Sequence, residues 1–457
     1  MKTKKLISIL LAILAILSIL SACTDTKNDS EPQKGDDNKE TGYLEALPET
    51  DRLVLYRNAD NSLMLDSAVN IFRRKYPYVD VEVRDFEGEE ESYWTLLSAE
   101  IPAGKGPDLM LISYSPFMDI YKTLETDVFC DLDDFMGSDP DFDLGDYNEA
   151  ALECGVYKGS RYFVPLSYRT KIILTTEEIL ASAGMELENL KSFDGYVREV
   201  KEYIEKHGDA KLVYDTQFQF MNMFFPWSGL RCLDYENRTV DVDGEEFKKV
   251  MEAYRDIYRQ DWELAEQLRT TISERDIADA LIGQKSVFGT ITSWHNFAYT
   301  YGALAVSGQS PRFFRFPSAN GEKVGQASIE AFVLNASPNK LNAYRLLKIM
   351  LSEEIQGNPQ EVTIGGFPVL KSAIEIHSKY RIEDNLKRVY DGQAISISEE
   401  AMQEYVDMAS DIDFCTIYTS QDSNIFYNTM MSYFMGADTY ENCLGKLKNQ
   451  MELYISE

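Results

Sequence analysis

The chain has 457 residues, and its 76 acidic side chains outnumber its 45 lysines and arginines, so the formal net charge at pH 7 is −31. A surface this acidic repels nucleic acid and anionic lipid, and neither is expected as a partner. The length is too great for one small hydrophobic core and is enough for two domains.

The first 22 residues have the pattern of a secretory signal peptide. Lys2, Lys4 and Lys5 precede an apolar run over 6–20, which is shorter than the roughly 20 apolar residues that a membrane span needs. The run ends in LSAC at 20–23, which resembles the lipobox of bacterial lipoproteins, where the cysteine thiol receives the lipid. We predict cleavage before Cys23, lipidation of Cys23 and anchoring at the extracellular face of the cell membrane. An ordinary signal peptide with an incidental cysteine is the alternative.

Residues 24–50 are polar and charged, with almost no apolar side chains. Such a segment buries too little surface to offset the entropy lost on ordering. We therefore predict a flexible tether over 23–50, with the folded body beginning at residue 51.

The folded body opens with alternating strand and helix patterns. Apolar strands are predicted at 53–56, 79–83 and 109–112, and helices with apolar residues at helical spacing at 65–76 and 93–101. This β-α-β-α-β order predicts a parallel sheet, whose ligands usually lie beyond the carboxyl ends of the strands. Further amphipathic helices are predicted at 193–204, 243–258, 337–351 and 440–454. The fold class is α/β.

Motifs of catalysis and metal binding are missing from the sequence. The five cysteines after Cys23 form no C-x-x-C pair, and their odd number excludes a complete disulfide framework. One bridge, such as Cys130 with Cys154, remains open. The three histidines lie far apart, and no H-E-x-x-H, P-loop or G-x-S-x-G sequence is present. We predict no catalytic residue, no metal and no cofactor.

Six fragments follow one another along the chain, at 72–83, 103–112, 157–185, 283–294, 335–356 and 365–373; examples are FRRKYPYVDVEV, AGKGPDLMLI and GGFPVLKSA. In this order they resemble the extracellular solute-binding proteins of ABC importers, in the family that includes maltose-binding protein. One departure concerns the hinge, because family members often carry Tyr-Asn-Lys after the crossing strand, whereas this chain has Thr175-Thr176-Glu177.

The resemblance implies a two-lobed periplasmic-binding-protein-like fold of type II, with a hinge between discontinuous lobes. We place lobe one at 51–165 and 318–356 and lobe two at 166–317 and 357–457. It also implies a monomer that captures a small molecule between the lobes and delivers it to the transmembrane subunits of an ABC permease. Carbohydrate, in particular an oligosaccharide, is the expected ligand class.

A carbohydrate site combines flat aromatic faces with polar groups that take hydroxyls in pairs. Trp294 follows a predicted strand, and a loop at that place would face the ligand. Trp227, in FFPWSG, is the second candidate. Core packing is the alternative role for both tryptophans.

Six further candidates stand near strand ends or turns. Tyr56 and Asn58 end the first strand and Tyr114 follows the third, although Asn58 is equally suited to capping a helix. Tyr168 and Arg169 lie in the segment predicted to cross between lobes, where Arg169 would grip hydroxyls or a carboxylate, or form a salt bridge. Phe367 follows two glycines, for which a simple turn is the competing account.

Three alternative functions remain open. The same fold binds non-sugar solutes, including polyamines and small anions. A sensory lipoprotein would present its ligand to a membrane kinase instead of a permease. A secreted glycan hydrolase would need a pair of carboxylates that the sequence does not single out.

Overall fold

The computed structural model describes residues 42–58, 62–112, 119–207, 212–214, 224–258, 273–360, 366–417 and 419–457. Together they belong to one compact unit, Thr41–Glu457. The predicted signal peptide, Cys23 and Tyr114 lie outside the described residues. Within the described ranges, no helix is both long enough and apolar enough to cross a membrane.

A seven-stranded sheet forms the core of the first lobe, and it contains the predicted β-α-β-α-β unit. Strand β1 pairs in parallel with both β2 and β3. All four residues of β3 are buried, as the uninterrupted apolar run predicts. The unit comprises β1 (Arg52–Arg57), α3 (Ser62–Lys75), β2 (Asp80–Asp85), α4 (Glu90–Glu100) and β3 (Leu109–Ile112).

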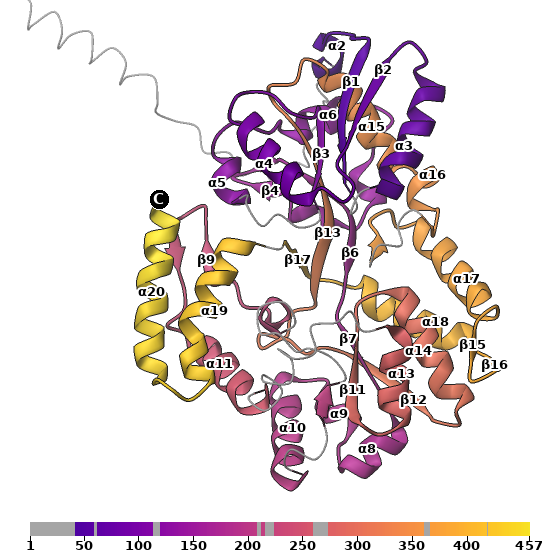
Figure 1. Ribbon diagram of the computed structural model, residues 1–457, viewed down its shortest axis with the longest axis vertical. Coiled ribbons are helices and arrows are strands. Elements are labelled where there is room, and N and C mark those ends of the chain that lie inside the picture. Colours follow the sequence, from indigo (N-terminus) through magenta and orange to yellow (C-terminus); the bar gives the residue numbers. More distant parts are fainter. Residues whose placement is uncertain are drawn as a thin grey trace, which may run out of the picture. The chain divides into compact units, whose positions relative to one another are not determined.

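The strand order of this sheet, β14-β6-β13-β3-β1-β2, brings distant segments together, and β17 pairs with β13. The longest strand, β13, is buried over its whole length and runs antiparallel to both β3 and β6. Helix α15 packs against α3, with α16 after it (Figure 1). The added elements are β6 (Val164–Arg169), β13 (Val324–Val333), α15 (Lys340–Leu351), α16 (Glu353–Gln356), β14 (Phe367–Pro368) and β17 (Phe414–Thr416).

A four-stranded sheet of order β12-β7-β11-β8 forms the core of the second lobe. Strands β7 and β11 are buried throughout, and helices α13 and α14 pack against each other beside them. The elements are β7 (Ile172–Thr176), α8 (Glu177–Ala183), α10 (Phe193–His207), β8 (Leu212–Tyr214), α13 (Glu274–Ile282), β11 (Ser286–Ile291), α14 (Trp294–Val306) and β12 (Pro311–Arg315).

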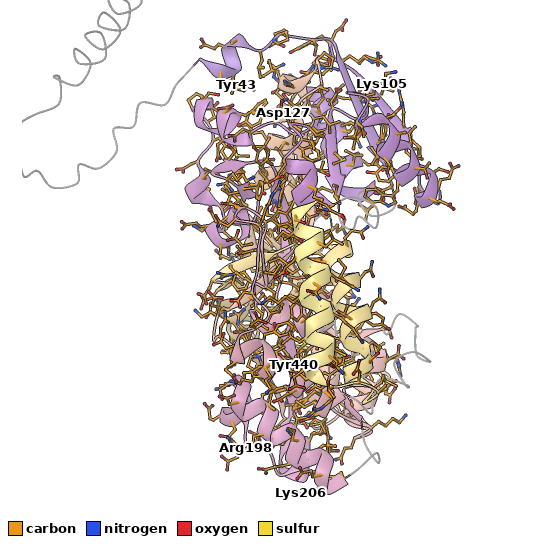
Figure 2. The ribbon with its side chains drawn as sticks, turned by 90° about the vertical axis from the view of Figure 1, so that its left-hand side faces the viewer. Tyr43, Lys105, Asp127, Arg198, Lys206 and Tyr440 are labelled. Carbon is orange, nitrogen blue, oxygen red and sulfur yellow. The ribbon has the colours of Figure 1, made fainter. Side chains whose placement is uncertain are left out.

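The two long C-terminal helices pack against each other, and the first of them, α19, also packs against α11 (Figure 1). Figure 2 shows the last helix from the side, with Tyr440 at its start. The predicted closing helix is therefore confirmed. The two C-terminal helices are α19 (Ser420–Phe434) and α20 (Tyr440–Ser456), and α11 spans Glu245–Tyr258. Two further helices, α17 (Ala373–Asn385) and α18 (Glu399–Ser410), pack against each other.

Short elements connect these parts. They are α5 (Ile120–Leu124), α6 (Leu132–Ser138), η1 (Leu144–Asp146), α7 (Glu149–Glu153), β4 (Val156–Tyr157), β5 (Ser160–Arg161), α9 (Leu187–Leu190), η4 (Phe225–Ser228), β9 (Leu233–Asp234), β10 (Thr239–Val240), β15 (Val389–Tyr390) and β16 (Gln393–Ala394).

The body begins before residue 51, so the predicted tether is too long at its C-terminal end. Helix α2 (Tyr43–Ala46) packs the Tyr43 ring against Phe135, with 5.0 Å between ring centroids. Glu49 pairs with Arg345 on α15. The prediction overlooked this docking because the long polar stretch before it hides a short apolar group, Tyr43, Leu44 and Leu47, which packs against the core.

The chain crosses between the sheets later than predicted. Strand β6 belongs to the first sheet through Arg169, and β7 begins the second sheet at Ile172. The boundary predicted at 165 therefore falls inside β6. Strands β14 and β17 also belong to the first sheet, although they lie in the range predicted for lobe two. The predicted boundary is misplaced because β6 runs without interruption from Val164 to Arg169, on both sides of the predicted division.

Candidate functional site

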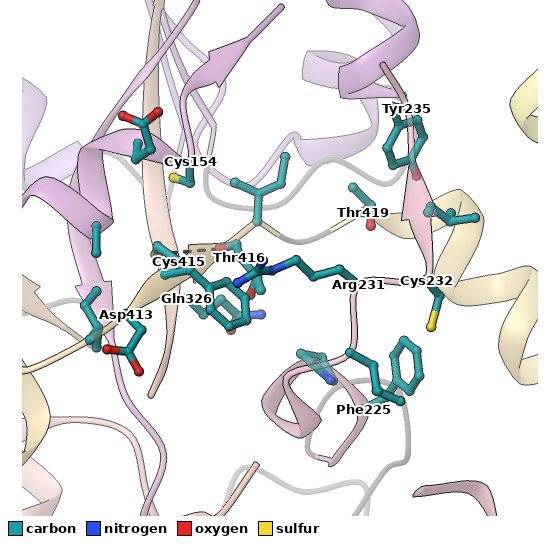
Figure 3. A pocket seen from close by; sticks show the side chains of 18 of the residues that line it. Cys154, Phe225, Arg231, Cys232, Tyr235, Gln326, Asp413, Cys415, Thr416 and Thr419 are labelled. Atoms are coloured by element: carbon teal, nitrogen blue, oxygen red, sulfur yellow. Dashed lines mark hydrogen bonds between the residues drawn. The ribbon is translucent and has the colours of Figure 1, made fainter. Parts of the chain in front are cut away.

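A cavity of about 830 Å³ lies where segments of both lobes meet the paired strands β6, β13 and β17, which we call the hinge strands (Figure 3). We call it the interlobe cavity. Its first-lobe residues include Tyr121, Asn148, Glu149, Glu153, Cys154 and Lys371; its second-lobe residues include Phe225, Arg231, Cys232, Tyr235, Asp422 and Phe426; and its hinge residues include Gln326, Asp413, Phe414, Cys415 and Thr416.

The hinge wall is built by the parallel pairing of β17 with β13. Gln326 lies opposite Thr416 in this register, and Gly325 lies opposite Cys415. A Cβ atom at Gly325 would lie 2.8 Å from the Ile412 side chain, so a larger residue there would require the Ile412 side chain to shift. The close pairing carries Phe414 and Thr416 to the cavity.

Arg231 supplies a cation whose position is fixed from two sides. Its guanidinium carbon lies 4.1 Å from the centroid of the Phe414 ring. Its Nη2 donates to both carboxylate oxygens of Glu322, at 2.8 and 2.9 Å. The side chain is 59% exposed, and Figure 3 shows it reaching across the cavity toward Gln326 and Thr416. An Arg held in this way is pre-organised to donate to a ligand.

The turn that carries Arg231 requires glycine. Gly229 has φ +81°, and an added Cβ would lie 2.2 Å from the Asn320 side chain. Asn320 Nδ2 donates to the Gly229 carbonyl at 2.9 Å and to Glu322 at 2.6 Å. One side chain therefore fixes both the turn and the carboxylate that holds Arg231.

Two tyrosines stack at the edge of the interlobe cavity. The rings of Tyr121 and Tyr235 are 4.0 Å apart at an interplanar angle of 15°. Tyr235 follows β9, and the hairpin of β9 and β10 continues to Arg238, whose Nη2 donates to Glu125 at 3.0 Å. The hairpin thus joins the second-lobe loop to the first lobe beside α5.

Asp422 is a partly buried carboxyl group next to Tyr235. It accepts from the Tyr235 hydroxyl at 3.2 Å, the Thr419 hydroxyl at 2.7 Å and the Ser423 N–H at 2.6 Å. Burial raises the pKa of Asp422 to about 6, although the three hydrogen bonds oppose the rise. Asp422 therefore changes charge in the mildly acidic range.

Polar and charged side chains continue from the interlobe cavity along strands β6 and β13. Arg169 Nε donates to the side-chain Oε1 of Gln326 at 3.1 Å, and burial lowers the pKa of Arg169. Further along β13, burial raises the pKa of Glu330 to about 8, and the nearby Arg169 charge only partly offsets this. The hinge thus contains a carboxyl group that is largely protonated at neutral pH.

The structure places Trp294 in a helix and not in a loop, which corrects the prediction. Ser293 caps helix α14 by accepting from the Asn296 N–H, and Trp294 is the first helical residue. Trp294 is 3% exposed, with its ring centroid 4.1 Å from that of Phe367. Phe367 in turn lies 5.8 Å from Tyr168. These three predicted residues come together, but they form a buried aromatic cluster.

The other predicted residues are also largely buried. Trp227 is 3% exposed in η4, next to the cavity residues Phe225 and Pro226. Tyr56 donates to Glu100 at 2.5 Å within the first lobe. Asn58 is 3% exposed. None of the seven predicted residues that the structure describes lines the interlobe cavity, and Arg169 reaches it only through Gln326.

Sequence reasoning missed Arg231, Tyr235 and Phe414. The first two follow the quoted FFPWSG segment by a few residues, and their available signal was an Arg and a Tyr close behind a tryptophan-containing turn. No sequence signal pointed to Phe414, because β17 is too short to show a strand pattern. In the described part of the chain, no group of three or more His, Cys, Asp or Glu side chains is arranged to hold a metal ion.

Comparisons with known proteins agree with this architecture. The family model of bacterial extracellular solute-binding proteins matches residues 60–357. The sugar-binding protein MalE from Xanthomonas citri is similar in structure, with a TM-score of 0.65 and 14% identity over 89% of this chain and 97% of that one. No curated protein matches the sequence.

Two further solved structures share the fold. The cyclic α-maltosyl-1,6-maltose binding protein from Arthrobacter globiformis has a TM-score of 0.59 and 16% identity, over 88% of this chain and 98% of that one. An ABC substrate-binding protein from Listeria monocytogenes, in complex with cycloalternan, has a TM-score of 0.56 and 16% identity, over 89% and 99%.

Two α/β lobes with crossing strands and a cavity between them define a two-lobed solute-binding protein. The family model covers more than half of the chain, so the chain belongs to the bacterial extracellular solute-binding protein family. The predicted family and fold class are confirmed. The family consists of binding proteins that act outside the cytoplasm.

Proposed function

We propose that this protein captures a carbohydrate in the interlobe cavity and delivers it to an ABC permease, while lipid on Cys23 holds it at the extracellular face of the membrane. The observation that carries the proposal is the composition of the cavity. It combines aromatic rings at Phe225, Phe414 and Tyr235 with a fixed Arg231. Sugar-binding proteins of the same fold from three bacteria support the ligand class.

The volume suits a small oligosaccharide. About 830 Å³ falls within the roughly 300–1,000 Å³ typical of small-molecule sites. The ring faces would cover the C–H patches of a pyranose, while Arg231 donates and Glu149 accepts hydrogen bonds from vicinal hydroxyls. Contacts from both lobes are complete only when the lobes close, so ligand shifts the population toward the closed form.

A cationic solute, such as an amino sugar or polyamine, is the second candidate. Four carboxylates line the interlobe cavity: Glu149, Glu153, Asp413 and Asp422. Of the two cations in the lining, Arg231 is paired with Glu322, and Lys371 donates to the Gly145 carbonyl at 3.0 Å. The excess negative charge would favour a ligand with an amino group.

A thermal-melting screen of the purified protein against neutral sugars, amino sugars, polyamines and organic acids separates these candidates. Ligand at about 100 times its dissociation constant should stabilise the native state by roughly 2.7 kcal/mol and raise Tm by a few degrees. We expect the shift to come from a neutral oligosaccharide and to shrink in Arg231→Ala.

Arg312→Ala is the matched control for this screen. Arg312 is also a partly exposed arginine paired with a glutamate, Glu177, but it does not line the interlobe cavity. A full shift in Arg312→Ala and a reduced one in Arg231→Ala would support the site. A shift only with polyamines or amino sugars would reject the neutral ligand in favour of the cationic one.

A further inference from the structure

Two cysteines from distant parts of the sequence lie together in the wall of the interlobe cavity. Cys154 directly follows α7, and Cys415 is the central residue of β17. Helix α7 packs against β17, and both cysteines line the cavity. Figure 3 shows them on the same side of it. Positions far apart in sequence are thus brought within reach of each other.

In this structure the Cys154 thiol donates to the Ala151 carbonyl at 3.1 Å and the Cys415 thiol donates to the Thr416 carbonyl at 3.8 Å. The contact with Cys415 is the first cause of a strongly raised Cys154 pKa, and burial is the second. The Cys130 sulfur instead faces the Asn335 side chain at 3.9 Å, so the bridge considered between Cys130 and Cys154 is not formed. All five described cysteines are free thiols in this structure.

We propose that Cys154 and Cys415 are a disulfide site in the wall of the interlobe cavity. The family acts outside the cytoplasm, where disulfides form and persist. A bridge requires Cα atoms within about 7 Å of each other, which the packing of α7 on β17 makes attainable. Formation consumes two thiols and one small-molecule disulfide as oxidant.

The reaction proceeds by thiol–disulfide exchange. The thiolate of one cysteine attacks the oxidant, forms a mixed disulfide and releases one small thiol. The second cysteine then attacks the protein sulfur, closes the bridge and releases the other small thiol. Because the pKa of Cys154 is raised, thiolate is scarce at neutral pH, and bridge formation should become faster as the pH rises.

The bridge would restrain the hinge side of the cavity. It would join α7 to β17, a strand of the first sheet that connects helices α18 and α19 along the chain. A crosslink between such distant positions stabilises the native state mainly by constraining the unfolded chain. Its effect on ligand affinity rests on the proposed function, whereas its formation does not.

Differential alkylation and peptide mass spectrometry test the proposal. The purified protein is incubated with oxidised glutathione at pH 8.5, alkylated and digested with and without dithiothreitol. We expect a linked pair of peptides containing Cys154 and Cys415, whose mass is two hydrogens below the sum of the two reduced peptides. Dithiothreitol should separate the pair into its two peptides. The oxidised protein should also melt a few degrees higher than the reduced protein.

Variants establish which residues form the bridge. Cys154→Ser and Cys415→Ser should each abolish the linked peptides, while Cys443→Ser, at a buried cysteine in α20, should retain them. Full alkylation of both cysteines after oxidation of the unmodified protein, or linkage of either to another cysteine, would overturn the proposal. This mass measurement needs no ligand. If the bridge forms but no sugar binds, only the proposed function is contradicted.

Discussion

The guanidinium of Arg231 lies over the ring of Phe414, with 4.1 Å between the guanidinium carbon and the ring centroid. Arg231 comes from a turn of the second lobe, and Phe414 from the strand that pairs with β13 in the hinge. The cation and the ring are thus neighbours in the wall of the interlobe cavity. We regard this pair as the centre of the ligand site.

Removal of the ring should weaken ligand binding. Aromatic stacking contributes about 0.5–1.5 kcal/mol and an exposed cation–π contact about 0.5–1 kcal/mol. Phe414→Ala should therefore raise the Kd of the best oligosaccharide by roughly 5- to 50-fold, measured by isothermal titration calorimetry. Leu386→Ala, at a residue 58% exposed on the surface, serves as a control and should leave Kd unchanged. An unaltered Kd in Phe414→Ala would remove the ring from the site.

Trp294 should behave as a core residue. It is 3% exposed and packs on Phe367 and Tyr405. Truncation of a buried aromatic side chain costs about 3–5 kcal/mol, so Trp294→Ala should lower Tm strongly with or without ligand. Chemical denaturation measures the loss. Normal stability combined with lost sugar binding would instead restore the role that the sequence suggested for this tryptophan.

The strand at 109–112 and Trp294 show where prediction from the sequence succeeds and where it fails. The strand at 109–112 could be predicted because an uninterrupted apolar run records burial on both faces. Trp294 was placed in a loop because it follows an apolar strand, whereas the Ser293 cap starts a helix there and turns the ring inward. The Arg231–Phe414 contact joins residues far apart in the chain, and no local pattern records such a contact.

The stability of the protein should depend on the charge of Glu330. Burial raises the pKa of Glu330 from about 4.5 to about 8, so the folded protein binds a proton that the unfolded chain releases. The contribution of Glu330 is therefore most favourable below pH 4.5, declines as the pH rises to 8 and stays low above it. Each unit of pKa difference corresponds to about 1.4 kcal/mol.

Glu330→Gln provides the comparison, because glutamine keeps the shape but not the charge. We expect the variant to gain stability relative to the unmodified protein as the pH rises from 5 to 8, by up to a few kcal/mol. Urea denaturation at a series of pH values measures the difference. Parallel stability curves over this range would show that Glu330 does not titrate there.

Cys23 should decide whether the protein stays with the membrane. If lipid on this cysteine is the anchor, Cys23→Ala should release the protein from the membrane fraction in a bacterial host. Detergent phase partitioning of the unmodified protein and the variant measures this. Cys443→Ser, at a buried cysteine of the folded body, is the control and should remain in the detergent phase. Equal partitioning of Cys23→Ala and the unmodified protein would contradict lipid anchoring through Cys23.

The central claim is that a carbohydrate binds in the interlobe cavity, and a crystal structure with the oligosaccharide that gives the largest melting shift tests it most directly. The account predicts a sugar ring stacked on Phe414, with hydroxyls within hydrogen-bond distance of Arg231 and Glu149. Sugar density outside this cavity, for example beside Trp294, with the cavity filled only by water, would contradict it.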